Sequence, residues 1–219
     1  MDLEALVALD PQLYVDMALY GDQLWYLGES EARVAEIVPT LGISMQQVPI
    51  IDSIRRFEEL SGMLGADLQS PEVTRAKADF ADAEAELQSA IAARPGLRVL
   101  VCSPGPDQIY IASSNWMTDL MYFKQLGLDV IAHPGTDAFE ALSWERAHTY
   151  PADLVLVDKR VSPADMERIN EIPTWSRLPA VAAGQVGPWY AGSPYSHRRF
   201  APIMRELADI IRNCRTDVA

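Results

Sequence analysis

The sequence has little of what marks several large protein classes. Its two cysteines, Cys102 and Cys214, are far apart and fit no metal-binding spacing, so we interpret them as a buried thiol and a thiol in the C-terminal tail. No run of about 18 apolar residues is present, which argues against a membrane-spanning helix. Basic residues are few: 18 Lys and Arg stand against 31 Asp and Glu, giving a net charge of −13. This charge argues against nucleic acids and anionic membranes as general partners, although it leaves room for a local basic pocket.

Sequence motifs of enzymes are also missing. No glycine-rich dinucleotide motif, Walker loop, nucleophile elbow or H-E-x-x-H motif occurs. His133 and His148 are isolated, and no group of His, Cys, Asp and Glu has the spacing of a first-row metal site. Ser113 and Ser114 precede a predicted helix, but candidate bases are distant in the sequence. We therefore expect no catalytic residues, no bound metal and no cofactor.

What is present is a long helix, predicted over residues 70–94. Ser70 is a suitable N-cap, Pro71 suits the first helical position, and Arg94-Pro95-Gly96 ends the helix. About 24 helical residues span roughly 36 Å. We interpret this segment as a rigid rod that joins two lobes, with an ordinary surface helix of one domain as the alternative. Apolar residues recur at steps of three and four in one narrow stripe, formed by Val73, Ala76, Phe80, Ala83, Leu87 and Ala90.

Helical and extended segments alternate on both sides of this helix, a pattern typical of α/β proteins with parallel-type sheets. Apolar residues make up 49% of the chain, enough for a sizeable core. The predicted domains are a partial N-lobe over 1–69, the inter-lobe helix over 70–94 and a C-lobe over 95–219. Strands are predicted at 13–17, 38–40, 43–46, 97–102, 108–112, 129–131 and 153–158. The other helices are predicted at 2–9, 29–36, 50–64, 116–126, 142–149, 164–171 and 197–212, and residues 187–195 are predicted to form a loop.

Four segments carry a resemblance to a known family: DLEALVALDPQLYV at 2–15, VPTLGIS at 38–44, LSWERAHTYPADLVLVD at 142–158 and IPTWSRLPAVAAGQV at 172–186. With the long helix, they make the chain similar to the helical-backbone class of ABC-transporter solute-binding proteins, which carry ferric siderophores, haem or cobalamin. The resemblance covers essentially the whole chain. It implies a binding protein without enzymatic activity that delivers an iron(III)–siderophore complex, an iron chelate, to an ABC-transporter permease at the extracytoplasmic side of the cell envelope.

Two alternatives remain open at this stage. The first is cobalamin or haem as the cargo, in which case Tyr20, Tyr110 or Tyr195 could serve as an axial haem ligand. The second is an α/β enzyme or interaction module that reuses the fold. Family members begin with a leader and about two further strands, whereas this sequence starts at the DLEAL helix and shows no signal peptide. The resemblance thus implies an N-lobe lacking its first part, which raises the prospect of self-association through an open sheet edge.

The resemblance also suggests where cargo would bind. In the family the ligand lies between the lobes, near loops at the strand ends, and aromatic rings suit a bulky amphipathic ligand. Arg198 and Arg199 could bind anionic oxygens at a helix start, and Glu4 and Glu145 match the positions that dock onto permease arginines. The candidate aromatic cargo contacts are Tyr20, Trp25, Tyr26, Tyr110, Trp116, Phe139, Trp189, Tyr190 and Tyr195.

Overall fold

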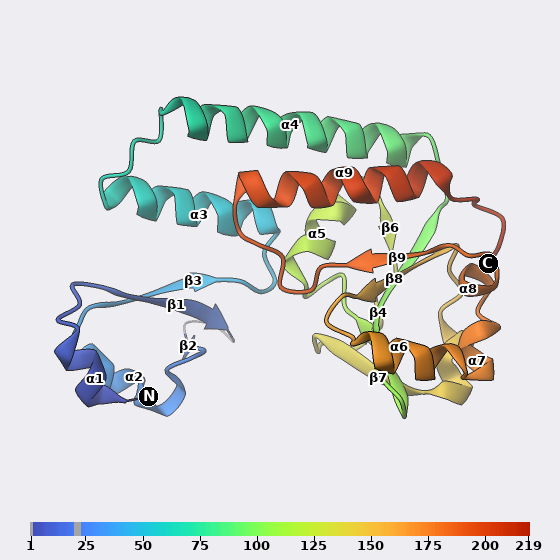
Figure 1. Ribbon diagram of the computed structural model, residues 1–219, viewed down its shortest axis with the longest axis horizontal. Coiled ribbons are helices and arrows are strands. Elements are labelled where there is room, and N and C mark those ends of the chain that lie inside the picture. Colours follow the sequence, from blue (N-terminus) through green and yellow to red (C-terminus); the bar gives the residue numbers. More distant parts are fainter. Residues whose placement is uncertain (1, 20–22) are drawn as a thin grey trace.

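The chain folds into a small N-lobe and a larger C-lobe, with long helices along one side (Figure 1). The computed structural model describes residues 2–19 and 23–219. Helices alternate with the strands of two separate sheets, which confirms the predicted α/β class. No described helix is both long enough and apolar enough to cross a membrane.

The N-lobe is built on a three-stranded sheet of order β2-β1-β3. Strand β1 (Tyr14–Leu19) lies parallel to β3 (Thr40–Ser44) and antiparallel to the short β2 (Gln23–Leu24). Its helices are α1 (Leu3–Ala8), the 3-10 turn η1 (Gly28–Ser30) and α2 (Glu31–Ala35). They share a small apolar core with one face of the sheet, made of Leu6, Leu24, Leu27, Val34 and Val38.

The opposite face of this sheet is partly open. Val15 on β1 and Leu41 on β3 are register partners and are 39% and 37% exposed. Parallel strands are normally covered on both faces, so two exposed apolar neighbours mark an incompletely covered surface.

Helix α3 (Ile50–Met63) follows the N-lobe in sequence but packs with the C-lobe. Its buried residues Ile50 and Ile54 belong to the same apolar cluster as Leu120 and Phe123. Residues 45–49 are therefore the connection between the lobes. The boundary of the N-lobe predicted from the sequence was residue 69. The backbone N–H of Gln47 donates to the carbonyl of Trp116 at 3.1 Å within this connection.

The C-lobe sheet has the order β7-β5-β4-β8-β9, with β6 (Asp129–Val130) beside the first residues of β4. Strands β4 (Arg98–Pro104) and β8 (Leu154–Asp158) are the central apolar runs and lie parallel, as their sequences predict. Strand β5 (Gln108–Ala112) runs antiparallel to β4 and β7 (Phe139–Ser143), and β9 (Val186–Trp189) runs parallel to β8. The remaining C-lobe helices are α5 (Thr118–Gln125), α6 (Pro163–Asn170), α7 (Pro173–Ser176), α8 (Pro179–Ala182) and α9 (His197–Asn213).

Two of the predicted C-lobe elements are wrong. The helix predicted over 142–149 is replaced by the end of β7 and a 3-10 segment, η2 (Trp144–Thr149), because residues 139–143 pair with β5. The loop predicted over 187–195 begins instead as strand β9, because residues 186–189 pair with β8. Both errors arise from pairing between segments far apart in the sequence.

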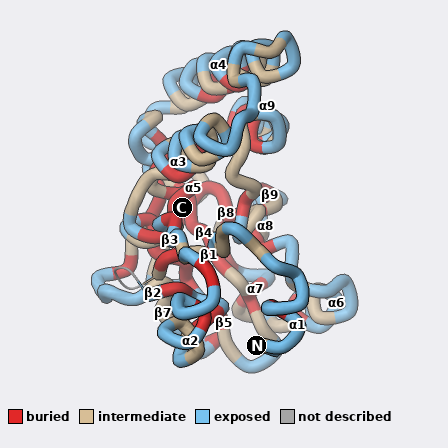
Figure 2. Tube along the Cα trace, turned by 90° about the vertical axis from the view of Figure 1, so that its left-hand side faces the viewer, coloured by how far each residue is buried: buried red, intermediate tan, exposed pale blue. Residues whose placement is uncertain are grey.

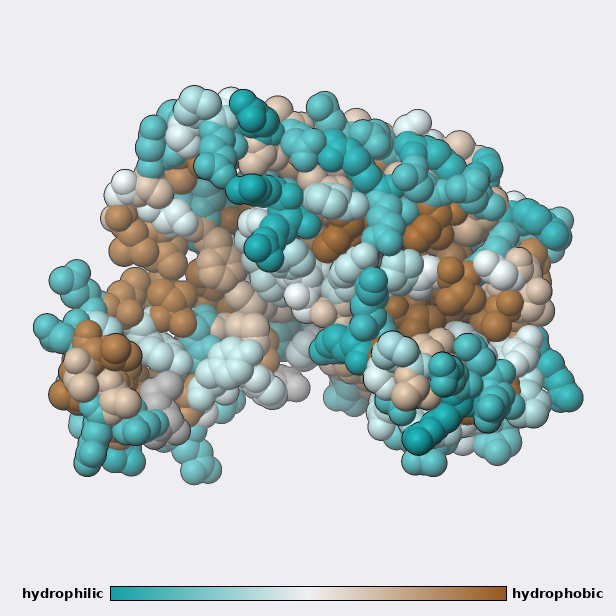
Figure 3. Space-filling view, viewed as in Figure 1, coloured by the Kyte–Doolittle hydropathy of each residue, from teal (hydrophilic) through white to brown (hydrophobic). Residues whose placement is uncertain are grey.

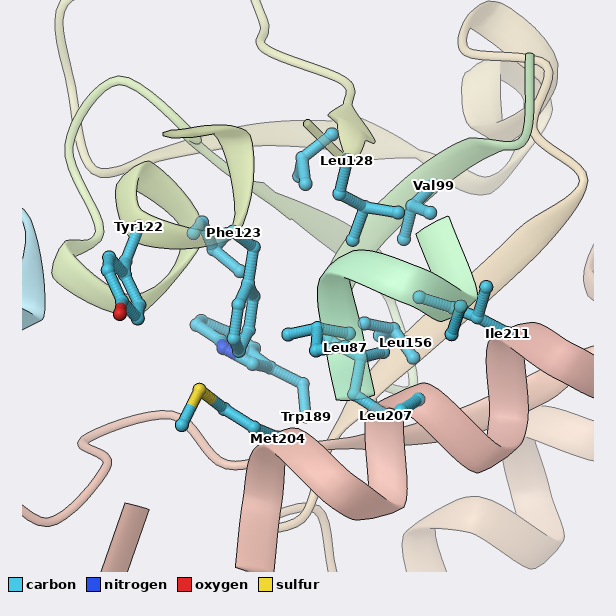
Figure 4. Close-up of a cluster of buried hydrophobic side chains, with 14 of the residues drawn as sticks. Leu87, Val99, Tyr122, Phe123, Leu128, Leu156, Trp189, Met204, Leu207 and Ile211 are labelled. Atoms are coloured by element: carbon cyan, nitrogen blue, oxygen red, sulfur yellow. The ribbon is translucent and has the colours of Figure 1, made fainter. Parts of the chain in front are cut away.

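Each face of the C-lobe sheet has its own core. On one face, helices α3, α4, α5 and α9 enclose a large cluster, in which Leu87, Leu156, Leu207 and Ile211 meet (Figure 4). On the other face, Trp175 and Trp144 pack edge to face with ring centroids 6.2 Å apart. Buried segments accordingly concentrate around the central strands, and the outer sides of the helices are exposed (Figure 2).

The predicted long helix exists as α4 (Pro71–Ala92), capped by the Ser70 hydroxyl, which accepts from Val73 N–H at 3.4 Å. The second half of its apolar stripe is buried, from Phe80 to Ala90. Along its length α4 lies beside α9 (Figure 1). Arg205 of α9 binds Asp79 at 2.8 Å and Glu86 at 3.2 Å on α4. The predicted long helix is therefore present, and it packs along α9 of the C-lobe.

Candidate functional site

An open notch separates the N-lobe from the C-lobe on the side away from α4 (Figure 3). In Figure 1, β2 lies on the N-lobe side of the notch and β7 on the C-lobe side. Strands β5 and β7 pair through Ala112 and Phe139, and through Tyr110 and Ala141. This register places Tyr110 and Phe139 on the same face of the sheet.

Three C-lobe aromatic residues form a continuous series. Trp189 packs edge to face on Phe139, with ring centroids 6.2 Å apart, and Phe139 packs in the same way on Tyr110 at 6.5 Å. Exposure rises along the series, from 3% at Trp189 to partial at Phe139 and 38% at Tyr110. The Tyr110 ring is further held by a hydrogen bond to its hydroxyl from the Gln108 side-chain amide. The series therefore presents one rigidly placed ring, Tyr110, to a ligand.

Trp189 is a core residue and not an open contact surface. Its indole lies beside Phe123 and Met204 in the large cluster (Figure 4). Its Nε1 donates to Asp119 Oδ2 at 2.7 Å. The prediction of a direct cargo contact at Trp189 is corrected on this ground, because the ring has almost no exposed area.

Tyr190 and Tyr195 lie in the segment between β9 and α9. Tyr195 is half-buried: it packs against Phe57 of α3 at 5.9 Å, and its hydroxyl lies 3.3 Å from that of Thr118. Tyr190 donates to Glu206 at 2.6 Å. Hydrogen bonding to this carboxylate raises the pKa of Tyr190. The structure thus brings Tyr195 to the contact between α3 and α5, and Tyr190 to the side of α9.

The two arginines at the start of α9 are exposed and face different surroundings. Arg198 binds Glu72 of α4 at 2.7 Å and so takes part in the contact between α4 and α9. Arg199 belongs with Arg198, Tyr190 and Glu206 to the lining of an open cavity of about 720 Å³ beside α9. Neither arginine is on the strands that flank the notch.

The N-lobe supplies two strongly exposed aromatic residues, Trp25 at 51% and Tyr26 at 70%. They follow β2 and are positioned by the buried carboxylate of Asp16. Asp16 Oδ2 accepts from the backbone N–H groups of Tyr26 at 2.9 Å and Leu27 at 3.2 Å. The candidate residue Tyr20 lies outside the described residues.

Trp116 joins the two lobes through its backbone, as the acceptor of the Gln47 bond. It comes directly before α5, and its side chain is partly exposed. Of the predicted candidates that are described, Trp25 and Tyr26 therefore follow β2 of the N-lobe, and Phe139 and Tyr110 lie on the paired C-lobe strands β7 and β5. Trp116 lies close to the connection between the lobes.

Glu4 and Glu145 are both exposed and lie on different lobes. Glu4 is in the first turn of α1, and Glu145 is in the first turn of η2. A hydrogen bond from the Ser143 side chain lowers the pKa of Glu145, so this group is ionised at neutral pH. Both side chains can offer a negative charge to a partner.

No metal-binding or nucleophilic constellation emerges in the described parts of the chain. There, no three His, Cys, Asp or Glu side chains are grouped to hold a metal ion. Cys102 and Cys214 are both buried, and burial raises the pKa of each thiol. Ser113 and Ser114 are only 1% exposed, and the Ser114 hydroxyl donates to a backbone carbonyl.

Two carboxylates important to this site were missed from the sequence. Asp16 stands within an apolar strand, and that pattern alone could have marked it as a buried, hydrogen-bonded group. Asp119 is at the start of a helix, where acidic residues are common, so the sequence offered no signal for its contact with Trp189.

The sequence model of the family described as periplasmic binding protein matches residues 1–189. The chain belongs to this family. Periplasmic binding proteins of this type bind substrates for ABC transporters, which agrees with the two-lobed fold and the notch. No curated protein sequence matches the chain.

Several solved structures of periplasmic binding proteins are similar to it. DesE, a ferric-siderophore receptor protein from Streptomyces coelicolor, is 34% identical, with a TM-score of 0.87 over 99% of this chain and 75% of its own. FhuD from Vibrio cholerae, solved with Fe3+–Desferal, is 19% identical, with a TM-score of 0.68 over 95% of this chain and 79% of its own. FeuA from Bacillus subtilis, an iron-uptake system-binding protein, is 15% identical, with a TM-score of 0.69 over 96% and 75%. The last two show the shared fold.

Proposed function

We propose that this chain is the substrate-binding component of an iron(III)–siderophore ABC importer and binds the ferric complex between its lobes. The observation that carries the proposal is the 34% identity to DesE over 99% of this chain. The exposed aromatic rings on both sides of the notch support it, because rings offer a bulky chelate much contact area at low entropic cost. The protein delivers its cargo without chemistry and needs no resident cofactor.

The cargo contacts we propose are Tyr110 and Phe139 from the C-lobe and Trp25 and Tyr26 from the N-lobe. Trp116 is proposed where the lobes meet. Tyr190, Tyr195 and Arg199 are not included among these contacts, because Tyr190 binds Glu206 of α9, Tyr195 packs on Phe57 of α3, and Arg199 lines the cavity beside α9. Trp189 and Arg198 are assigned to packing and to the α4–α9 contact.

A titration with Fe3+–Desferal tests the cargo class by quenching of tryptophan fluorescence. We expect saturable quenching, and we expect Tyr110→Ala to weaken binding about tenfold, because it removes an aromatic anchor. Met63→Ala is the control, since Met63 is 84% exposed at the far end of α3. Haem, followed by its Soret band, and cobalamin are titrated in parallel. Binding of either one, with no response to Fe3+–Desferal or to a catecholate complex, would contradict the proposal.

We also propose that Glu4 and Glu145 dock the protein onto the permease at the extracytoplasmic side of the membrane. With one exposed carboxylate on each lobe, docking would depend on these two charges and on the distance between the lobes. Charges at the rim of an interface fix the relative orientation of the partners more than they raise the affinity. Glu145→Lys is expected to lower cargo uptake in cells without changing the affinity for Fe3+–Desferal. Glu171→Lys, another exposed acidic residue, is the control. Equal uptake by both variants would refute the docking role.

A further proposal concerns self-association through the N-lobe. The face bearing Val15 and Leu41 is partly open. On the β2 side of β1, the described backbone contacts begin at Met17, whose carbonyl accepts from Trp25 N–H at 2.9 Å, and continue at Ala18 and Leu19. A second copy that adds a strand beside residues 14–16 of β1 would pair this edge and place its side chains next to Val15. Sedimentation velocity is expected to show a dimer that Val15→Lys disrupts, and a monomer at all concentrations would contradict it.

A further inference from the structure

Asp119 is a buried carboxyl group that the proposed cargo site does not itself use. It is 5% exposed, and no ion pair involves it in the described part of the chain. Oδ1 accepts from Leu120 N–H at 2.9 Å, and Oδ2 accepts from Trp189 Nε1 at 2.7 Å. The Ser193 hydroxyl lies 3.5 Å from Oδ2. A carboxyl group buried without a cation costs folding free energy, which its hydrogen bonds offset only in part.

The contacts of Asp119 lead directly to the exposed ring of the site. Trp189 is bonded to Asp119 and packs on Phe139, and Phe139 packs on Tyr110. Because Trp189 and Phe139 belong to the close-packed core or its margin, a displacement of one ring is transmitted to the next. Strand β9 does not pair with β7, so the link from Trp189 to Phe139 depends on side-chain packing, whereas Phe139 and Tyr110 also lie on paired strands.

We propose that Asp119 is a positioning residue for cargo binding, holding Tyr110 in place through the rings of Trp189 and Phe139. The proposal rests on the proposed function and adds a group that touches no cargo. Ionised, Asp119 binds the indole N–H through a charge-assisted hydrogen bond, roughly twice as strong as a neutral one. Protonated, it holds Trp189 less firmly, and Tyr110 shifts in response.

The surroundings of Asp119 allow this change near neutral pH. Burial raises the pKa of Asp119 to about 6, against the lowering effect of its hydrogen bonds. The ionisable groups around it are Tyr195, which interacts with it electrostatically, and Tyr190 and Glu206, which line the same small pocket from the segment after β9 and from α9. From β8 and α5 the neighbours in the same cavity, Leu156 and Phe123, are apolar. None of these groups supplies a positive charge that would keep the carboxyl ionised in acid.

The positioning is tested without cargo by 19F NMR of protein labelled with 3-fluorotyrosine, with the Tyr110 resonance assigned from Tyr110→Phe. We expect this resonance to shift with a midpoint near pH 6, and we expect Asp119→Asn and Trp189→Phe each to abolish the shift. Glu206→Gln is the matched control, since it removes a carboxylate from the same cavity and should leave the shift unchanged. A pH shift that persists in Asp119→Asn or in Trp189→Phe would overturn the proposal.

Binding of Fe3+–Desferal provides the second test of the role of Asp119. The dissociation constant of Asp119→Asn is expected to rise about fivefold at pH 7.5, the effect of weakening one charge-assisted hydrogen bond. The wild type should show a similar rise on acidification to pH 5, whereas the variant should not. Unchanged affinity and an unchanged pH profile in Asp119→Asn would refute the role in binding. If the wild type shows the Tyr110 shift but binds no siderophore, the positioning stands and the proposed cargo is wrong.

Discussion

Replacement of Leu87 by alanine tests whether α4 is part of the C-lobe core. Leu87 is fully buried and meets Leu156, Leu207 and Ile211 (Figure 4). The substitution removes three carbons, worth about 2–2.5 kcal/mol of transfer free energy at ~0.8 kcal/mol each. The cavity left in a close-packed cluster adds about 1–2 kcal/mol. We therefore expect the free energy of unfolding to fall by about 3–4.5 kcal/mol.

Urea unfolding followed by circular dichroism at 222 nm measures this change. Gln88→Ala is the control, because Gln88 is the next residue on the same helix and is exposed. Its cost should stay within about 0.5 kcal/mol. If α4 were a free rod with a thin apolar stripe, both variants would unfold at nearly the same urea concentration. A loss below about 1 kcal/mol for Leu87→Ala would refute the assignment of α4 to the core.

Three further predictions concern charged groups. The raised pKa of Asp119, about 6 against an ordinary 3.8, means that the folded chain binds more protons than the unfolded chain between about pH 4 and 6. The contribution of Asp119 to the free energy of unfolding therefore falls by up to about 3 kcal/mol as the pH rises through this window, and Asp119→Asn should remove that fall from urea titrations at pH 4.5 and 7. Asp16→Ala leaves the N–H groups of Tyr26 and Leu27 without their acceptor and should cost about 2 kcal/mol, seen as faster amide hydrogen exchange in the N-lobe; unchanged exchange would contradict this. Arg205→Met breaks the part-exposed ion pairs with Asp79 and Glu86. Thermal unfolding should show a loss of about 1 kcal/mol in the free energy of unfolding at low salt, and a smaller loss in 0.5 M NaCl. A loss that does not depend on salt would argue for lost packing instead.

Patterns contained within one segment were predictable from the sequence. The capping of α4 by Ser70, the stripe that buries Phe80 and Leu87, and the apolar strands β4 and β8 all follow from local spacing and composition. The strand predicted over residues 108–112 is also present as β5 and carries Tyr110.

Features set by distant pairing were not predictable in this way. Trp189 is buried only because residues 186–189 join β8 at the edge of the sheet and bring its indole to Asp119, 70 positions away. Helix α3 shows an amphipathic pattern, but the pattern does not reveal that Ile50 and Ile54 pack with the C-lobe. The sequence pattern predicts which face of a helix is apolar, but the segment that covers this face depends on the tertiary fold.

The short connection at residues 45–49 has a mechanical consequence. Gln47 has a φ of 53°, a left-handed conformation that a residue with a side chain adopts only at some cost, and its N–H is tied to Trp116. Since α3 and α4 are both packed with the C-lobe, this connection is where we expect the molecule to hinge. Closure around cargo would then be a rotation of the small N-lobe relative to the C-lobe and helices α3 and α4. It would change a few backbone torsions at residues 45–49 and would not bend the long helix.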